Sequence, residues 1–349
     1  MNNITKIDKN FKVETRIAKA DIKFYSVNEM PFKIYGVQLE NGRYRRMPEN
    51  VARGVSDGVF SLHSNTSGGR VRFVTDSHYV AISADMDNFA RKTYFALAGS
   101  AGFDLYCDNA YQKTFLPPSE MENGYESVIE LGEKKLREIT INFPLYSDVL
   151  SLYIGVSDEA VLKEALPYVN SKPVVYYGSS ITQGACASRP GRCYPSIISR
   201  RFNCDYVNLG FSGNAMAEDE IIEYIKKLDM SIFVYDYDYN APTVEHLRDT
   251  HEKMFKAIRS ENPSIPIIIM SRPKVNLTEG EKERRHIIEE TYKNALEAGD
   301  NNVYFIDGKR LMELCGDEGT IDGVHPTDFG FASMAKALED IIEANNLLK

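Results

Sequence analysis

Two adjacent serines, Ser179 and Ser180, stand where a buried strand is expected to end, in the stretch VVYYGSSITQG. A serine hydroxyl is a weak nucleophile at neutral pH. It becomes reactive when a base lies within hydrogen-bond reach, a third group orients that base, and hydrogen-bond donors stabilise the developing oxyanion. These three requirements decide which other residues of the chain could take part in chemistry with either serine.

His325 is the candidate base. It lies in the turn DGVHPTDFG, after the last expected strand and before the last expected helix, and Pro326 fits a helix start there. Asp322, three residues earlier, could accept a hydrogen bond from Nδ1, which would leave Nε2 free to take the serine proton. The structural alternative is a turn in which Asp322 accepts only backbone N–H groups.

The other five histidines are expected to take no part. His63 and His78 lie in the strand-rich first half of the chain. His246, His251 and His286 fall in polar helical patterns, and we expect them on solvated helix faces.

Three groups are candidate oxyanion donors: the Ser180 amide, the Gly213 amide and the Asn240 side chain. A properly aimed donor lowers the barrier by about 3 kcal/mol. Each residue also has a purely structural reading. Ser180 could be a helix N-cap, Gly213 could serve a tight turn, and Asn240 could form an Asx turn before Pro242.

The second half of the chain predicts an α/β fold. Continuous apolar runs, typical of strands buried on both faces, alternate with helical patterns at about 243–262, 279–298 and 329–345. The apolar runs are VVYYG, YVNLGF, SIFVYDY, IPIIIMS and VYFIDG. In a parallel sheet ligands bind beyond the carboxyl ends of the strands, which is where the candidate residues fall.

The first half predicts a β-sandwich of jelly-roll type. Short runs rich in β-branched and aromatic residues are separated by turn clusters such as SNTSGG and MENGYE. The expected strands include FKIYGVQ, RVRFVTDSHYVAISADM, TYFALAG, FDLYCD, EITINFPLY and LSLYIGV. We place the N-terminal domain at residues 1–165 and the α/β domain at 166–349.

The composition argues against some classes of binding partner. The formal net charge of −9 gives no electrostatic footprint for nucleic acid or an anionic membrane, and no segment is apolar enough to span a bilayer. The five cysteines are scattered without a CxxC pair, and the first residues lack an apolar signal segment, so we expect a cytoplasmic protein. No metal or organic cofactor is expected, and a homo-oligomer is compatible with the sequence.

Four blocks together resemble the SGNH hydrolases, the GDSL-type esterases and lipases. They are G178-S-S-I-T182, G210-F-S-G-N214, Asn240 and D322-G-V-H325, and GFDLYCD resembles the GxDLY signature of a β-rich domain that precedes some SGNH domains. The resemblance implies a flavodoxin-like domain with a five-stranded parallel sheet. It also implies a Ser180 nucleophile, donors at Ser180, Gly213 and Asn240, and a catalytic pair of Asp322 and His325.

The chain departs from the family pattern in two places. Ser179 stands where the family usually has Asp, which leaves open which serine acts; alignment on Gly178 and Thr182 favours Ser180. The third block reads DYDYNAP rather than GxND, so Asp236 and Asp238 lie close to Asn240.

These observations predict a serine esterase that removes small acyl groups, acetyl above all, from a carbohydrate or related polyol. The carbohydrate part follows only from the resemblance and from the sandwich domain. Two alternatives stay open: an acyltransferase with the same triad, and a catalytically weak carbohydrate-binding protein. Ser179 and Arg189 are candidate substrate contacts, Arg189 with the alternative of a solvated loop residue.

Overall fold

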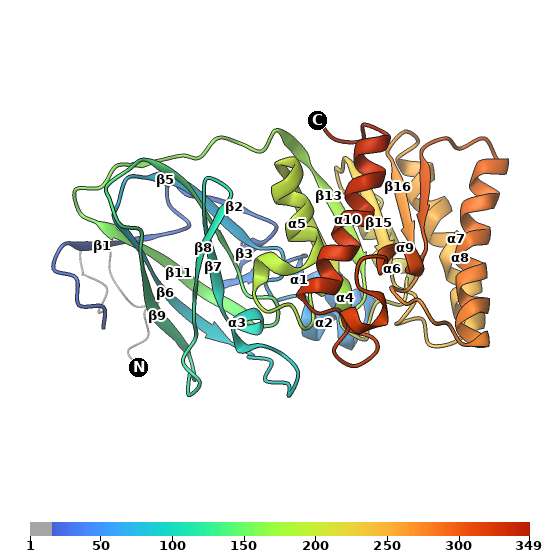
Figure 1. Ribbon diagram of the computed structural model, residues 1–349, viewed down its shortest axis with the longest axis horizontal. Coiled ribbons are helices and arrows are strands. Elements are labelled where there is room, and N and C mark those ends of the chain that lie inside the picture. Colours follow the sequence, from blue (N-terminus) through green and yellow to red (C-terminus); the bar gives the residue numbers. More distant parts are fainter. Residues whose placement is uncertain (1–15) are drawn as a thin grey trace. The chain divides into compact units, whose positions relative to one another are not determined.

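The computed structural model describes residues 16–349, which form two compact units (Figure 1). Unit 1 contains the described chain up to Arg46, Ser64–Pro167 and Ser188–Gly191. Unit 2 contains Met47–His63, Tyr168–Ala187 and Arg192–Lys349. The domain boundary between residues 165 and 166 stays a prediction. Residues 1–15, on which the expectation about a signal segment depends, lie outside the described residues.

Unit 1 is built from two antiparallel sheets that share one apolar core. The first has the order β1-β11-β6-β9, and the second has the order β12-β5-β10-β7-β8, with β2 also pairing with β5. Inward-facing residues of both sheets, such as Ile82 and Phe73, are fully buried in one cluster. The predicted β-sandwich is confirmed. Its strands are β1 (Ile22–Ser26), β2 (Lys33–Tyr35), β5 (Arg70–Thr75), β6 (Tyr79–Asp87), β7 (Phe103–Cys107), β8 (Ala110–Phe115), β9 (Gly124–Glu130), β10 (Arg137–Asn142), β11 (Asp148–Ser157) and β12 (Leu162–Lys163), and β3 (Gln38–Glu40) pairs with β4 (Arg43–Arg45).

The first half also contains helices that sequence reasoning did not predict. TYFALAG, expected as a strand, ends instead in the short helix α3 (Leu97–Ser100). Helices α1 (Glu49–Val55) and α2 (Asp57–Leu62) belong to unit 2, although they lie within the range assigned to the N-terminal domain. Their apolar residues, including Val59, are buried in the core of unit 2, and this burial holds them there.

Unit 2 has a five-stranded parallel sheet in the order β14-β13-β15-β16-β17, which confirms the predicted α/β fold. The strands are β13 (Asn170–Gly178), β14 (Cys204–Gly210), β15 (Ile232–Asp236), β16 (Ile267–Met270) and β17 (Val303–Ile306). The further helices are α4 (Ser180–Gln183), α5 (Tyr194–Phe202), α6 (Asp219–Ile225), α7 (Val244–Glu261), α8 (Glu279–Glu297), α9 (Gly308–Leu311) and α10 (Asp328–Ala344), with 3-10 turns η2 (Pro190–Arg192) and η3 (Gly316–Gly319).

Helices cover both faces of this sheet, which explains its continuous apolar strands (Figure 1). Val175 and Tyr177 of β13 join a core cluster with residues of α6, α7 and α8. On the opposite face the ring of Tyr176 contacts that of Tyr194 in α5, with centroids 5.5 Å apart, and α5 packs against α10. β14 is added on one side of β13 and β15, β16 and β17 on the other, so the order of strand addition changes sides at β13 while all strands stay parallel. In folds of this kind, ligands bind at the carboxyl edge of such a switch point.

Within residues 16–349, no helix is both long enough and apolar enough to cross a bilayer. The same residues contain no group of three or more His, Cys, Asp or Glu side chains that could hold a metal ion. All five cysteines are free thiols.

Candidate active site

The two serines have different places in the turn that follows β13. Ser179 is the N-cap of the one-turn helix α4, and its Oγ accepts a hydrogen bond from the Ile181 amide at 3.1 Å. Ser180 is the first residue of α4, so its hydroxyl does not cap the helix. The role of helix N-cap, considered above for Ser180, therefore belongs to Ser179.

Ser180, His325 and Asp322 form a continuous hydrogen-bonded series. Oγ of Ser180 lies 2.9 Å from Nε2 of His325, and Nδ1 of His325 lies 2.7 Å from Oδ2 of Asp322. Oδ1 of Asp322 also accepts hydrogen bonds from the backbone amides of Val324 and His325. Asp322 therefore stabilises the turn with one oxygen and contacts the imidazole with the other. Partial burial opposes ionisation of Asp322, but these hydrogen bonds outweigh it and lower the pKa of the carboxyl. An ionised Asp322 can orient the imidazole and stabilise its protonated form.

Backbone contacts hold the loop that carries His325. The Ile321 amide donates to the His325 carbonyl at 2.9 Å, and the Gly323 amide donates to Oγ1 of Thr320 at 3.1 Å. Thr327 is the N-cap of α10, which begins at Asp328. Pro326 therefore precedes the cap, whereas the sequence had suggested that it starts the helix. The hydroxyl of Thr327 accepts a hydrogen bond from an N–H group of the first helical turn, which a proline side chain cannot do.

Gly213 lies in a loop that is hydrogen-bonded to the turn carrying Ser180. Its φ of 72° is in the left-handed region, and no atom lies within 4 Å of the position that a Cβ would occupy. Glycine is therefore required by the backbone conformation, while the space above it stays open. The Ser212 amide donates to Oε1 of Gln183 at 3.0 Å, and the Phe211 amide donates to the Gly178 carbonyl at 2.8 Å.

Asn240 has its side chain oriented by a neighbouring loop. Its Oδ1 accepts a hydrogen bond from the Ala215 backbone amide at 3.2 Å, and the backbone amide of Asn240 donates to the Tyr237 carbonyl at 2.9 Å. With the carbonyl end of the side chain engaged, the Nδ2 group is the end that can serve as a donor to a ligand.

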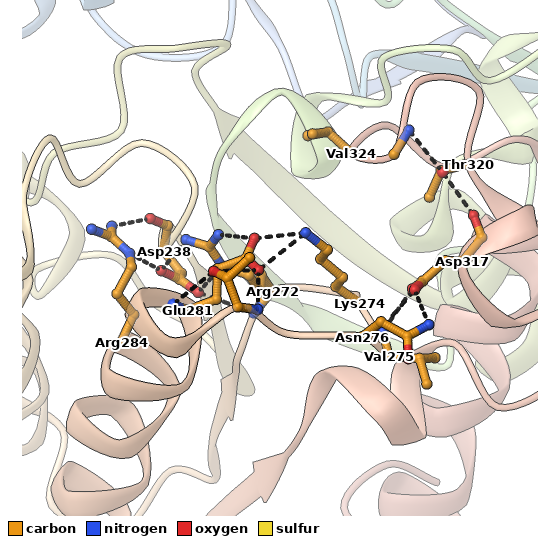
Figure 2. A network of polar contacts seen from close by, with 12 residues as sticks. Asp238, Arg272, Lys274, Val275, Asn276, Glu281, Arg284, Asp317, Thr320 and Val324 are labelled. Carbon is orange, nitrogen blue, oxygen red and sulfur yellow. Dashed lines mark hydrogen bonds and ion pairs between the residues drawn. The ribbon is translucent and has the colours of Figure 1, made fainter.

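A buried charge network braces the loop around Asn240 (Figure 2). Asp238 receives hydrogen bonds from Arg272 and Arg284, three of them between 2.8 and 2.9 Å. Nη2 of Arg284 also donates to the carbonyls of Asp238 and Ala241, which lie on either side of Asn240. Burial opposes ionisation of Asp238, but the two guanidinium groups prevail and lower its pKa. The carboxylate therefore stays charged and the loop stays pinned to α8.

The contacts in Figure 2 continue toward the loop that carries Asp322. Asp317 accepts hydrogen bonds from the amides of Val275 and Asn276 at 2.7 and 3.1 Å. The Thr320 hydroxyl donates to the Asp317 carbonyl at 2.8 Å. The segment after β16 thus supports the turn from which Asp322 and His325 extend.

The two candidate substrate contacts both have partners in the structure. Ser179 is fully buried as well as being the cap of α4. Nη1 of Arg189 lies 2.7 Å from Oδ2 of Asp104, and its guanidinium stacks on the Tyr111 ring at 3.7 Å. Asp104 belongs to GFDLYCD and also accepts the Gly191 amide at 2.8 Å, so this motif holds the Ser188–Gly191 segment inside unit 1. Substrate binding by Ser179 and Arg189 stays a prediction.

Sequence reasoning missed several polar residues around the site and noted Asp236 only as a neighbour of Asn240. Asn208 and Asp236 are buried polar residues inside otherwise apolar strands. Gln183 accepts a hydrogen bond from the Ser212 amide, and the Tyr194 hydroxyl donates to Asp236. A polar residue in a buried strand run is a usable signal, since burial without a partner is costly.

The expectation for His251 was wrong. It is 2% exposed, with its ring stacked on Tyr235 and Tyr237 and its Nδ1 2.8 Å from the Thr291 hydroxyl. His251 lies on the same face of α7 as the buried residues Leu247, Met254 and Phe255, so the helical periodicity was a signal that the expectation overlooked.

Comparison with protein-family models gives two matches along the chain. Residues 171–343 match the GDSL-like Lipase/Acylhydrolase family. Residues 22–162 match the GxDLY model, described as the N-terminus of Esterase_SGNH_hydro-type. A search of curated protein sequences gives no significant match.

Solved structures resemble nearly the whole described fold. A GDSL-like lipase from Bacteroides ovatus is 28% identical, with a TM-score of 0.83 over 94% of this chain and 99% of its own. The salicylyl-acyltransferase SsfX3 of a tetracycline biosynthetic pathway is 18% identical, with a TM-score of 0.77 over 94% of this chain and 98% of its own. The acetyl xylan esterase Est2A of Butyrivibrio proteoclasticus is 12% identical, with a TM-score of 0.61 over 93% of this chain and 98% of its own.

The last two likenesses concern the fold alone. The two family models go further, because they match the sequence itself over residues 22–162 and 171–343. The chain therefore belongs to the SGNH-type, GDSL-like hydrolase family, with a GxDLY domain preceding its hydrolase domain.

Proposed function

We propose that this protein is a serine esterase that removes small acyl groups, acetyl above all, from hydroxyl groups of a carbohydrate or related polyol. The observation that carries the proposal is the series Ser180–His325–Asp322, with distances of 2.9 and 2.7 Å. These are hydrogen-bond distances between a nucleophile, a base and an orienting carboxylate. Ser180 keeps an exposed fraction of 7%, which favours a small acyl group over a bulky one.

The reaction proceeds through an acyl-enzyme. Oγ of Ser180 attacks the ester carbonyl carbon while Nε2 of His325 takes the hydroxyl proton, and Asp322 stabilises the imidazolium. When the tetrahedral intermediate collapses, the ester C–O bond breaks and His325 returns the proton to the leaving alcohol. Water, deprotonated by His325, then attacks the acyl-enzyme, releasing the acid and restoring the serine.

The proposed oxyanion donors are the amides of Ser180 and Gly213 and the Nδ2 group of Asn240. The orientation of Asn240 by Ala215 and the open space above Gly213 support these roles. Donors fixed before the reaction need no reorganisation when the negative charge develops, which is what makes them effective.

The carbohydrate part of the proposal is supported by family membership and by the likeness in fold to an acetyl xylan esterase. The acyl part is testable separately, with p-nitrophenyl esters of increasing chain length. Activity that falls from acetate to longer chains supports a small-acyl pocket, whereas a preference for long chains contradicts it.

The deciding experiment compares wild type, Ser180→Ala and Ser179→Ala in hydrolysis of p-nitrophenyl acetate. We expect Ser180→Ala to lower kcat by about 10³-fold or more, because the nucleophile is lost. Ser179→Ala should keep kcat within about tenfold and lower the stability by about 1 kcal/mol, because it loses only a helix cap.

Equal activity in wild type and Ser180→Ala would contradict the proposal and favour a binding protein. Ester products formed with an added acceptor alcohol, analysed by mass spectrometry, would indicate an acyltransferase instead. A release of acetate from acetylated oligosaccharides, abolished in Ser180→Ala, would support the carbohydrate substrate.

A further inference from the structure

A buried carboxyl group, that of Asp236, contacts the turn that carries the proposed nucleophile. Asp236 is the last residue of β15, it is 5% exposed, and its register partner in β13 is Gly178, two residues before Ser180. A Cβ at Gly178 would lie 1.9 Å from Oδ1 of Asp236, so glycine is needed there for the carboxylate to fit. The carboxyl group and the backbone that leads to the proposed nucleophile are therefore in direct contact.

Donors to Asp236 come from both sides of Ser180. The Thr182 hydroxyl donates to Oδ1, and the Ser179 amide also donates to the carboxylate. The Tyr194 hydroxyl donates to Oδ2 at 3.3 Å and lies 3.2 Å from the Thr182 hydroxyl. One side chain thus fixes the residue before the nucleophile and the residue two positions after it.

This arrangement bears on position 179, where the chain has Ser and the family usually has Asp. Ser179 brings no carboxylate to the turn, and its hydroxyl is used as the cap of α4. A carboxyl group hydrogen-bonded to the turn comes instead from the neighbouring strand β15. Burial raises the pKa of Asp236 to about 7, which is the cost of placing an acid in this position.

We infer that Asp236 is a positioning residue that holds the Ser180 turn in register with His325, a role that rests on the proposed function of Ser180. It acts through Thr182 and Ser179 and does not itself touch the substrate. Because a misplacement of about 1 Å can lower a rate by about 10²-fold, the loss of this anchor should lower kcat more than it raises KM.

The sharpest test is a pair of substitutions at Thr182. Thr182→Val keeps the shape but removes the donor, and Thr182→Ser keeps the donor. With p-nitrophenyl acetate we expect kcat to fall by about 10- to 100-fold in Thr182→Val, with KM within about twofold of wild type. Thr182→Ser should retain kcat within about threefold. Asp236→Asn should resemble Thr182→Val, because one of its two terminal atoms can no longer accept.

Thr291→Val is the matched control. Thr291 is a threonine of the same unit, 2% exposed, whose hydroxyl bonds to His251 and to the Ile287 carbonyl. The substitution removes an equivalent buried hydroxyl away from the turn. It should lower the melting temperature while leaving kcat per folded molecule unchanged. The labelling rate of Ser180 by an alkyl fluorophosphonate provides a second readout of the nucleophile.

The inference is overturned if Thr182→Val and Thr291→Val lower stability alike and both keep wild-type kcat and labelling rate. It is also overturned if Thr182→Ser loses as much activity as Thr182→Val. Failure of the proposed function looks different, because in that case Ser180→Ala itself would retain the hydrolysis and no fluorophosphonate adduct would form on Ser180.

Discussion

The hydroxyl oxygen of Ser180 lies 2.9 Å from Nε2 of His325, although 145 residues separate the two in the chain. The serine follows the end of β13 and the histidine lies in the loop before α10. The sheet brings these distant segments to the same edge, because its strands are all parallel and their carboxyl ends coincide.

Asp322→Asn tests the role of the orienting carboxylate. The substituted side chain keeps an oxygen that can accept the Val324 and His325 amides, so the turn should fold as in wild type. Its NH₂ group would face Nδ1 of His325 and favour the wrong tautomer. We therefore expect kcat for p-nitrophenyl acetate to fall by about 10³- to 10⁴-fold, with an unchanged melting temperature. A kcat within tenfold of wild type would show that the histidine works without Asp322.

Substitutions at Asn240 separate its donor from its acceptor. Asn240→Ala removes both, and Asn240→Asp keeps an oxygen for the Ala215 amide but replaces the donor by a negative charge. Both variants should lower kcat by about 10²- to 10³-fold, since one oxyanion donor is lost in each. Steady-state kinetics report the loss of the oxyanion donor, and thermal melting reports the loss of the acceptor for the Ala215 amide. Asn240→Asp keeps this acceptor and should melt near the wild-type temperature. Full activity in Asn240→Asp would remove Asn240 from the oxyanion site.

Gly58→Ala tests the packing of α2 against the segment 210–214, which contains Gly213. A Cβ at Gly58 would lie 1.8 Å from Oδ1 of Asn214, the residue after the proposed donor Gly213. We expect this overpacking to destabilise unit 2 by about 1–3 kcal/mol in urea unfolding and to lower kcat by shifting the donor loop.

Two variants serve as controls for this effect. Gly54→Ala, in the adjacent helix α1, has open space for the added methyl group and should stabilise the protein by about 0.5–1 kcal/mol. Asn214→Ala combined with Gly58→Ala removes the clashing amide and should recover most of the loss. If Gly58→Ala and Gly54→Ala behave alike, α2 does not press on the donor loop.

His251 predicts a pH dependence of stability. Burial lowers its pKa to about 3, while the unfolded chain has an ordinary value near 6.5. Below pH 6.5 the unfolded state therefore binds a proton that the folded state does not, so the free energy of unfolding falls as the pH drops from about 6.5 to about 3.

The measurement compares wild type with His251→Gln, because carboxylates elsewhere also contribute to acid unfolding. Urea unfolding at pH 7.5, 6, 5 and 4 should give a difference between the two proteins that shrinks as the pH falls, since only wild type loses stability through the imidazole. A difference that stays constant with pH would contradict the buried, neutral state of His251.

The sequence determined the repeating order of strand and helix in unit 2 and the position of the chemical groups along it. Helices expected at 243–262, 279–298 and 329–345 are α7, α8 and α10, within about two residues at each end. Strands buried on both faces need continuous apolar runs, and residues just after them reach the carboxyl edge. These are local rules, which a single sequence displays, and they point to the pair of serines and to Asp322 and His325, whereas the choice of Ser180 came from the resemblance to the family.

Only the tertiary structure decided which buried polar groups support these residues and where some segments belong. Asp236 in β15 bonds to the turn after β13, and α1 and α2 pack in unit 2, because partners far apart in the chain satisfy their polar and apolar surfaces. For His251 the tertiary structure supplied the polar partner, the Thr291 hydroxyl of α8, although its place on the apolar face of α7 is visible in the sequence. Periodicity reports the structure of one segment, whereas burial depends on every segment that packs against it.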